Sequence, residues 1–213
     1  MGKKICFIFG AGEQKIPKNK FPTPDFIIAS DGGYKVLEEY KIVPDLLVGD
    51  FDSLSYVPNC DIKKLNVEKD ETDTFICINE AIKLGCNEIF LFCCTGGRID
   101  HTFANIQSLI HIAKNNAMGY LIDGDYIITA LPVSKPIAFS EKASGMVSIF
   151  SADTEVYDIS ILGLKYALNG ATLTNCFPLG VSNQFIGKKS KIVAQKGILL
   201  VVFPSQAFSE IIR

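Results

Sequence analysis

Apolar runs alternate with segments of helical period over the first part of the chain, up to about residue 130. Strands that are covered on both faces are apolar almost throughout, so short apolar runs predict buried strands. Strands that alternate with helices in this way indicate a mostly parallel α/β sheet. The predicted strands are Ile5–Phe9, Phe26–Ser30, Leu46–Gly49, Ile89–Cys94 and Tyr120–Ile122.

Two segments between these runs predict amphipathic helices. Either Thr72 or Asp73 can cap a helix whose apolar positions continue to a stop at Gly85. A second helix is predicted to begin near Asp100 and to end before Asn115. The face that this second helix should bury consists of Phe103, Ile106, Ile110 and Ala113.

After Pro132 and Pro136 the chain changes to short β-rich segments separated by Gly, Asn, Ser and Asp turns. Short strands at this spacing favour a small sandwich or barrel. We therefore expect two domains, an α/β domain at residues 1–131 and an all-β domain at residues 137–213. The predicted strands of the second domain are Met146–Phe150, Glu155–Ile161, Ala171–Thr174, Lys191–Ala194 and Ile198–Phe203.

Composition excludes several classes of protein. A hydrophobic content of 48% is too high for a disordered chain, and a net charge of −2 argues against nucleic acid as a partner. The longest charge-free stretch, Tyr166–Gly187, is rich in Gly, Asn, Ser and Pro, so no membrane span is expected. Seven cysteines without a Cys-x-x-Cys pair are typical of a reduced, cytoplasmic protein.

Acidic residues gather directly after the predicted strands of the first domain. Asp31 follows the second strand, Asp50 and Asp52 follow the third, and Asp73 and Asp100 stand at the starts of the two helices. Loops at the carboxyl ends of parallel strands converge on one crevice, so these carboxylates can meet. The alternative, that each Asp only caps a helix or shapes a turn, stays open.

Such a carboxylate cluster would need a cation. Two carboxylates about 4 Å apart repel by ~4 kcal/mol at an effective dielectric near 20. A set of oxygen ligands without His or Cys suits Mg²⁺, which usually shares its coordination with substrate phosphates. Asp50 and Asp52 are two residues apart, so in an extended chain they can grip one ion together.

Glycine pairs add candidate phosphate contacts. Gly32-Gly33 and Gly96-Gly97 both precede predicted helix starts, where backbone N–H groups can approach an anion. Arg98 adds a forked donor for phosphate oxygens. Gly10-Ala11-Gly12 is a weaker signal, because a dinucleotide fingerprint would require glycine at position 15, where Lys15 stands.

The order of these motifs resembles the thiamine pyrophosphokinase family. The resemblance implies a homodimeric enzyme that moves the pyrophosphoryl group of ATP to the hydroxyethyl oxygen of thiamine and releases AMP. It implies that ATP and Mg²⁺ lie on the α/β domain and that thiamine lies against the β domain, with the active site at an interface between two chains. The motifs are Asp31-Gly32-Gly33, Pro44 to Ser53, Lys69 to Asp73, Gly96 to His101, Gly163 to Tyr166 and Leu179 to Asn183.

The resemblance also implies roles for individual residues. Asp50, Asp52 and Asp73 resemble metal ligands; Asp31, Gly32, Thr72, Arg98 and Asp100 resemble ATP contacts; Ser182 and Asn183 resemble thiamine contacts. The expected catalytic set is Asp50, Asp52, Asp73, Arg98 and Asp100, and either Asp73 or Asp100 could take the alcohol proton. Animal and fungal relatives present a Trp ring to thiamine, whereas this chain has no Trp, so its stacking residue is unassigned.

Two other classes of function stay open. Asp50-Phe51-Asp52 could be the nucleophile and acid pair of a haloacid-dehalogenase-like phosphatase. That class is disfavoured because its paired Asp should follow the first strand. The remaining alternative is a non-catalytic sensor of thiamine or nucleotide, which would not need every carboxylate that Mg²⁺ requires.

Overall fold

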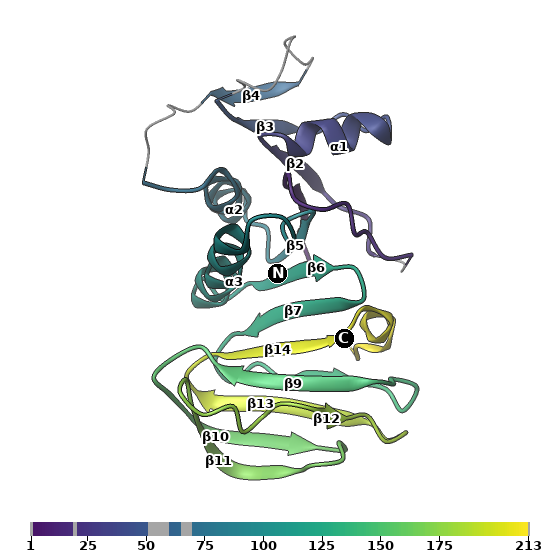
Figure 1. Ribbon diagram of the computed structural model, residues 1–213, viewed down its shortest axis with the longest axis vertical. Coiled ribbons are helices and arrows are strands. Elements are labelled where there is room, and N and C mark those ends of the chain that lie inside the picture. Colours follow the sequence, from purple (N-terminus) through teal and green to yellow (C-terminus); the bar gives the residue numbers. More distant parts are fainter. Residues whose placement is uncertain (1, 19–20, 51–59, 65–69, 213) are drawn as a thin grey trace. The chain divides into compact units, whose positions relative to one another are not determined.

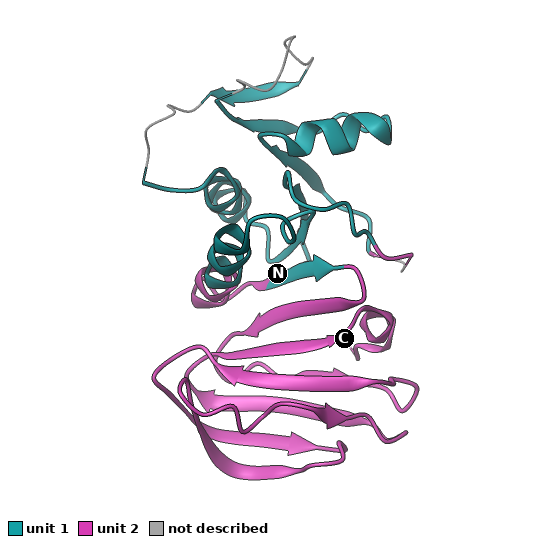
Figure 2. Cartoon of the chain, viewed as in Figure 1, with its two compact units in different colours: residues 1–16, 22–108, 119–123 teal, residues 17–21, 109–118, 124–213 magenta. Residues whose placement is uncertain are grey.

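The computed structural model describes residues 2–18, 21–50, 60–64 and 70–212 (Figure 1). They divide into two compact units (Figure 2). Unit 1 comprises residues 1–16, 22–108 and 119–123, and unit 2 comprises residues 17–21, 109–118 and 124–213. None of the described helices is long and apolar enough to cross a lipid bilayer.

Unit 1 is built on a mostly parallel sheet, as the sequence predicts. Its strands follow the order β6-β5-β1-β2-β3-β4, and the pairs β5-β1, β1-β2, β2-β3 and β3-β4 are parallel. The strands β1, β2 and β3 have the bounds predicted from their apolar runs. The strand bounds are β1 Ile5–Phe9, β2 Phe26–Ser30, β3 Leu46–Gly49, β4 Asp61–Lys64, β5 Glu88–Phe92 and β6 Met118–Asp123.

Three helices accompany this sheet: α1 Gly33–Glu39, α2 Asp73–Lys83 and α3 Ile99–Lys114. Figure 1 draws α2 and α3 on one side of the sheet and α1 on the other. This follows from the right-handedness of crossovers, because α1 leads outward from β2 to β3 while α2 leads back from β4 to β5.

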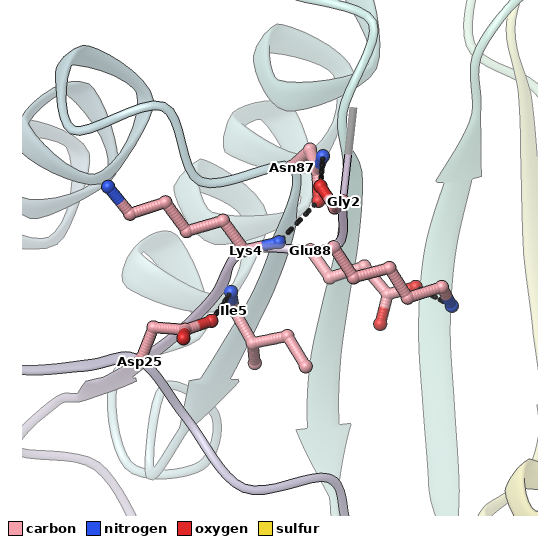
Figure 3. A network of polar contacts seen from close by, with 7 residues as sticks. Gly2, Lys4, Ile5, Asp25, Asn87 and Glu88 are labelled. Carbon is pink, nitrogen blue, oxygen red and sulfur yellow. Dashed lines mark hydrogen bonds and ion pairs between the residues drawn. The ribbon is translucent and has the colours of Figure 1, made fainter.

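The strand starts of unit 1 are fixed by side chains from the neighbouring strand (Figure 3). Asp25 stands just before β2, and its Oδ2 accepts the backbone N–H of Ile5 at 2.7 Å. Asp45 stands just before β3 and accepts the N–H of Ile27 at 2.7 Å. Asn87 stands just before β5, and its Oδ1 accepts the N–H of Lys4 at 3.0 Å. These bonds satisfy amides at the amino edge of the sheet, opposite the edge where the predicted site lies.

The predicted capping of α2 is confirmed in its first alternative. Thr72 is the N-cap, and its Oγ1 accepts the N–H of Phe75 at 3.2 Å, while Asp73 is the first helical residue. The helix buries Ile76, Cys77, Ile78 and Ala81.

The predicted buried face of α3 is wrong in part: Ala113 is buried as predicted, whereas Ile106 and Ile110 are half-buried. Phe103 is 64% exposed, and the buried residues are Asn105, Ser108, Leu109, Ile112 and Ala113. Two of these are polar and satisfy their groups by hydrogen bonds to backbone carbonyls. A reading by hydrophobicity alone therefore misplaced the face, since a buried polar residue that is hydrogen-bonded costs little.

Unit 2 consists of antiparallel sheets, which confirms the predicted change to an all-β architecture. One set of neighbours is β12-β9-β14-β7 and the other is β11-β10-β13-β8. Aromatic side chains join them, since the ring of Phe139 lies 5.2 Å from that of Phe203 and 5.0 Å from that of Phe185. The bounds are β7 Tyr126–Leu131, β8 Ile137–Phe139, β9 Met146–Ser151, β10 Glu155–Leu162, β11 Leu168–Thr174, β12 Asn183–Gln184, β13 Ser190–Lys196 and β14 Leu199–Pro204, followed by the 3₁₀ helix η1 Ser205–Glu210.

The strand β7 lies in unit 2, although the expected first domain extends to residue 131. It pairs along its whole length with β14, from Tyr126 opposite Pro204 to Leu131 opposite Leu199. Because β14 is remote in the sequence, the composition near β7 does not show that this strand pairs within unit 2.

Candidate functional site

A cleft in unit 1 collects most of the predicted carboxylates. Its volume is about 540 Å³. It lies where β2 and β3 end and α2 begins, the convergence that the parallel sheet predicts. Its lining is Ala11, Ser30, Asp31, Asp50, Glu71, Thr72, Asp73, Thr74, Arg98 and His101. Asp52 lies outside the described residues, so its metal-ligand role stays a prediction.

Backbone geometry brings Asp31 and Asp50 to this cleft. Asp31 has a φ of 45°, a conformation that Asp tolerates better than most residues, and its N–H donates to Val48 O at 2.7 Å. A Cβ on Gly49 would lie only 3.1–3.2 Å from the Cα, Cβ and Oδ1 atoms of Asp31. Glycine at position 49 therefore allows the end of β3 to carry Asp50 alongside Asp31.

Close packing against β1 explains why position 33 is a glycine. A Cβ at this position would lie 1.9 Å from Phe9 O, so only glycine lets α1 begin this close to the end of β1. Gly32 is the N-cap residue of α1 and makes no side-chain cap bond. Its contact with ATP stays a prediction.

The N-terminus of α2 is held against the end of β2. Ser30 Oγ lies 3.3 Å from Thr74 Oγ1, and the Thr72 cap closes the first turn. Asp73 lies in that first turn, where the helix dipole favours a negative charge. The same field would favour a phosphate in the cleft.

Arg98 and Asp100 form a forked ion pair. The Nη2–Oδ2 distance is 2.5 Å and the Nε–Oδ1 distance is 3.2 Å. Arg98 lines the cleft, whereas Asp100 is not among the lining residues and bonds the guanidinium through both carboxylate oxygens. The hydrogen bond from Arg98 lowers the pKa of Asp100 to about 2. A carboxylate with so low a pKa is a weak proton acceptor, so Asp100 is a poor general base while this pair persists.

A second cavity of about 410 Å³ shares Ala11, Thr74, Arg98 and His101 with the cleft. No functional role is predicted from the sequence for His101, nor for three other residues that line this cavity, Glu13, Cys94 and Asn105. A signal was available, because positions 98, 101 and 105 are spaced by three and four and so share one side of a helical segment.

Gly10 and Gly12 serve loop packing beside this cavity. Their N–H groups donate to Phe92 O at 2.9 Å and to Cys93 O at 2.6 Å. A Cβ on either glycine would lie within 2.8 Å of the residues after β5. These two amides donate to carbonyls of the chain itself, so they are not available to a bound anion.

The expected thiamine contacts lie in unit 2. Ser182 is exposed, with a φ of 61°, and its N–H donates to Ser148 Oγ at 3.1 Å. Asn183 is buried, and its side chain spans the backbone of Tyr166, accepting from its N–H at 2.9 Å and donating to its carbonyl at 2.6 Å. Asn183 also lines a cavity of about 240 Å³, together with Ile161, Tyr166, Leu168, Leu179, Gly180 and Val181.

The acidic cleft fits Mg²⁺ by its donor chemistry. Mg²⁺ is commonly held by one or two protein carboxylates and completes its shell with water and phosphate oxygens. Asp50 and Asp73 line the same cleft and supply such carboxylates. Within the described residues no group of three or more His, Cys, Asp or Glu side chains is close enough to hold a metal by itself.

The fold and the cleft together define a class of protein. Phosphoryl-type transfer needs positioned phosphates and charge neutralisation more than a covalent nucleophile. A cleft that joins carboxylates, a forked arginine and a helix N-terminus fits this chemistry, and the class of protein that it indicates is a phosphoryl- or pyrophosphoryl-transferring enzyme.

Comparisons with known proteins identify the family. Residues 18–121 match the family model "Thiamin pyrophosphokinase, catalytic domain", and residues 136–199 match "Thiamin pyrophosphokinase, vitamin B1 binding domain". The chain belongs to the thiamine pyrophosphokinase family and is an enzyme that transfers a pyrophosphoryl group to thiamine.

Individual relatives agree with this assignment. A thiamine pyrophosphokinase of Bacillus subtilis is 29% identical over 209 residues, which cover 94% of this chain and 98% of the relative. The crystal structure of thiamine pyrophosphokinase from Bacillus subtilis gives a TM-score of 0.81 at 26% identity, covering 95% of this chain and 99% of that one. The thiamin pyrophosphokinase from Geobacillus thermodenitrificans gives 0.80 at 26% identity, covering 94% and 97%.

Proposed function

We propose that the pyrophosphoryl donor is ATP, bound with Mg²⁺ in the acidic cleft of unit 1, and that AMP is released. The observation that carries this proposal is the convergence of Asp31, Asp50, Asp73 and Arg98 on one cleft at the start of α2. Asp50 and Asp73, with Asp52 as the third expected ligand, would hold Mg²⁺. When bound, Mg²⁺ would supply positive charge that offsets the charge of the phosphates.

Each cleft residue takes a distinct role in this proposal. Arg98 donates to oxygens of the transferring group, and Asp100 keeps the guanidinium plane in place by the fork described above. Asp31, Gly32 and Thr72 contact the nucleotide. Of the two expected acceptors of the alcohol proton, Asp73 and Asp100, Asp100 is disfavoured because its pKa is about 2.

Thiamine is proposed to bind in unit 2, beside Ser182 and Asn183. Tyr166 lines the 240 Å³ cavity there, and 58% of this residue is exposed, so its ring can stack on a ligand. A tyrosine face attracts cations, and the ammonium of Lys165 lies 5.5 Å from the centre of the Tyr166 ring. The thiazolium ring would take the place of this ammonium or stack on the opposite face, so that Tyr166 provides the surface that a Trp provides in animal and fungal relatives. Asn183 holds the backbone of Tyr166 and so supports this surface. In this division of labour residues 1–131 bind ATP and Mg²⁺, and residues 137–213 bind the vitamin.

We also propose a homodimer, with the active site at the interface between the chains, in the cytoplasm. Large apolar side chains exposed on unit 2 support an interface, among them Met146, Leu162, Phe177 and Leu179. All seven cysteines are free, and five of them are buried, which supports a reducing compartment.

Product analysis tests the proposed reaction. The protein is incubated with ATP, Mg²⁺ and thiamine, and the products are followed by phosphorus NMR. AMP together with thiamine diphosphate supports the proposal, whereas inorganic phosphate indicates a phosphatase and no turnover indicates a sensor. Chelation of Mg²⁺ should abolish the reaction, and its restoration should recover it.

Two matched variants test the cleft. Asp73→Asn removes a carboxylate that lines the cleft, whereas Asp70→Asn removes one three residues earlier, exposed and absent from the lining. Turnover should fall by orders of magnitude in the first variant and stay near normal in the second. An equal effect of both substitutions would contradict the assignment of the cleft. Sedimentation analysis of the unmodified chain tests the homodimer.

A further inference from the structure

The loop from Thr95 to Arg98, called here the arginine loop, carries the guanidinium to the cleft. It joins the end of β5 to the start of α3 (Figure 1). Its two glycines have positive φ values, 78° for Gly96 and 60° for Gly97, outside both helical and strand conformations. Regular secondary structure therefore does not fix the path of this loop, and its position depends on contacts at its ends.

One end of the arginine loop is tied to β6 and to the loop after β1. Thr95 Oγ1 donates to Asp123 Oδ1 at 2.7 Å, and Thr95 O accepts the N–H of Glu13 at 2.9 Å. The Lys15 ammonium, 2.7 Å from the Glu13 carboxylate, and the Gly97 N–H both lower the pKa of Glu13. The Glu13 side chain thus lies across the two glycines, where any Cβ on Gly96 would meet it at 2.4 Å.

A second tie, made by Asn105, acts at the same end of the arginine loop. Its side-chain Nδ2 donates to Cys94 O, the residue just before the arginine loop, at 2.7 Å. Asn105 is only 5% exposed, so this bond is sheltered from water and competes with no solvent partner. The bond joins α3 to the chain after β5 and closes the arginine loop between its two ends. Asn105 and Arg98 line the same 410 Å³ cavity.

We propose that Asn105 is a positioning residue that acts through Arg98. Its bond to Cys94 O fixes the arginine loop, and thereby the place at which Arg98 meets the transferring group. This inference rests on the proposed role of Arg98 at the phosphates. Loss of the bond lets the guanidinium shift, and a displacement of about 1 Å at a reacting group can cost on the order of a hundredfold in rate.

The test uses Asn105→Asp, which keeps the size of the side chain and removes its donor. The matched control is Ser108→Ala, on the same buried face of α3, because in the described part of the chain the Ser108 hydroxyl donates within its own helix, to Ala104 O at 2.8 Å. Asn105→Asp should lower kcat ten- to hundredfold and leave the KM for thiamine within twofold. Ser108→Ala should change neither. Asn105→Gln, which keeps an amide donor on a longer chain, should recover part of kcat, and it serves as the second variant if Asn105→Asp does not fold.

A double-mutant cycle with Arg98→Ala decides the mechanism. If Asn105 acts through Arg98, the double variant should be no slower than Arg98→Ala alone. Multiplicative losses in the double variant would overturn the proposal and leave Asn105 a purely structural residue. A normal kcat in Arg98→Ala would overturn the proposed role of Arg98 itself, and the positioning role with it. An unchanged kcat in Asn105→Asp beside an impaired Arg98→Ala would refute only the positioning role.

Discussion

Replacing Asn183 by Ala should separate support of the fold from contact with thiamine, the two roles that the motif Leu179 to Asn183 combines. Asn183 is 6% exposed and joins β12 to the Tyr166 segment. Its Oδ1 accepts the N–H of Tyr166 and of Gln184, each at 2.9 Å, and its Nδ2 donates to Tyr166 O at 2.6 Å. The neighbouring Ser182 makes its bond to Ser148 through the backbone, so Ser182→Ala keeps that bond.

The expected loss of stability follows from these bonds. Each buried hydrogen bond contributes about 0.5–1.5 kcal/mol net, so the loss of all three predicts roughly 2–4 kcal/mol for Asn183→Ala. For a chain of this size each kcal/mol corresponds to about 2–4 °C in Tm, which gives a decrease of roughly 4–16 °C. Asn183→Asp keeps the two acceptor bonds but places a carboxylate oxygen where Nδ2 lies 2.6 Å from Tyr166 O, so burial of this charge should also lower Tm. Ser182→Ala should leave Tm within about 1 °C.

Calorimetry tests both stability and binding. Thermal scans give Tm for Asn183→Ala, Asn183→Asp and Ser182→Ala, and titrations at a temperature where all are folded give the affinities for thiamine and for Mg-ATP. Thiamine should bind several-fold more weakly to Asn183→Ala, since Tyr166 loses its support, and Mg-ATP should bind normally. The reasoning is refuted if Tm is unchanged in Asn183→Ala, or if Ser182→Ala lowers it as much.

Further predictions concern unit 1. Asp52→Asn should leave folding almost intact and cut turnover by orders of magnitude; near-normal turnover at saturating Mg²⁺ would exclude the metal-ligand role. Arg98→Lys keeps the charge but loses the planar fork, so steady-state kinetics should show a lower kcat as well as a higher KM for ATP. Asp100 has a lowered pKa, so its pairing with Arg98 contributes fully above the ordinary Asp pKa and is lost only as pH falls through about 2. A carbon NMR titration should therefore show the Asp100 carboxyl titrating near pH 2, and nearer its ordinary pKa of 3.8 in Arg98→Ala. Gly33→Ala would place a Cβ 1.9 Å from Phe9 O and should therefore lower the free energy of unfolding strongly. The control is Gly85→Ala, whose Cβ would meet nothing within 4 Å and which should lose only the ~1 kcal/mol expected for Ala at a positive φ. Urea denaturation of the two variants should show the larger loss in Gly33→Ala.

The sequence by itself determined the architecture and the cleft in which Asp31, Asp50 and Asp73 meet. Apolar runs gave the bounds of β1, β2 and β3, because a strand buried on both faces leaves a continuous apolar record in its own residues. The carboxylates after these strands meet because the carboxyl ends of parallel strands lie at one edge of a sheet, whatever the details of packing. The cap at Thr72 also needed only local information, since a cap bond spans three residues.

The tertiary structure alone decided which polar residues serve as supports. Asn105 bonds a carbonyl 11 residues away, and Asn183 bonds a backbone segment 17 residues away. The same is true of β7, whose Leu131 lies opposite Leu199. The tertiary structure determines such partners, because the residues next to a polar side chain in the sequence do not indicate which carbonyl it will bond. The buried face of α3 was misplaced in part because it contains Asn105 and Ser108, which hydrophobicity assigns to solvent. Asn105 is tolerable in the interior because the fold supplies Cys94 O as its partner, and Ser108 because it bonds a carbonyl of its own helix.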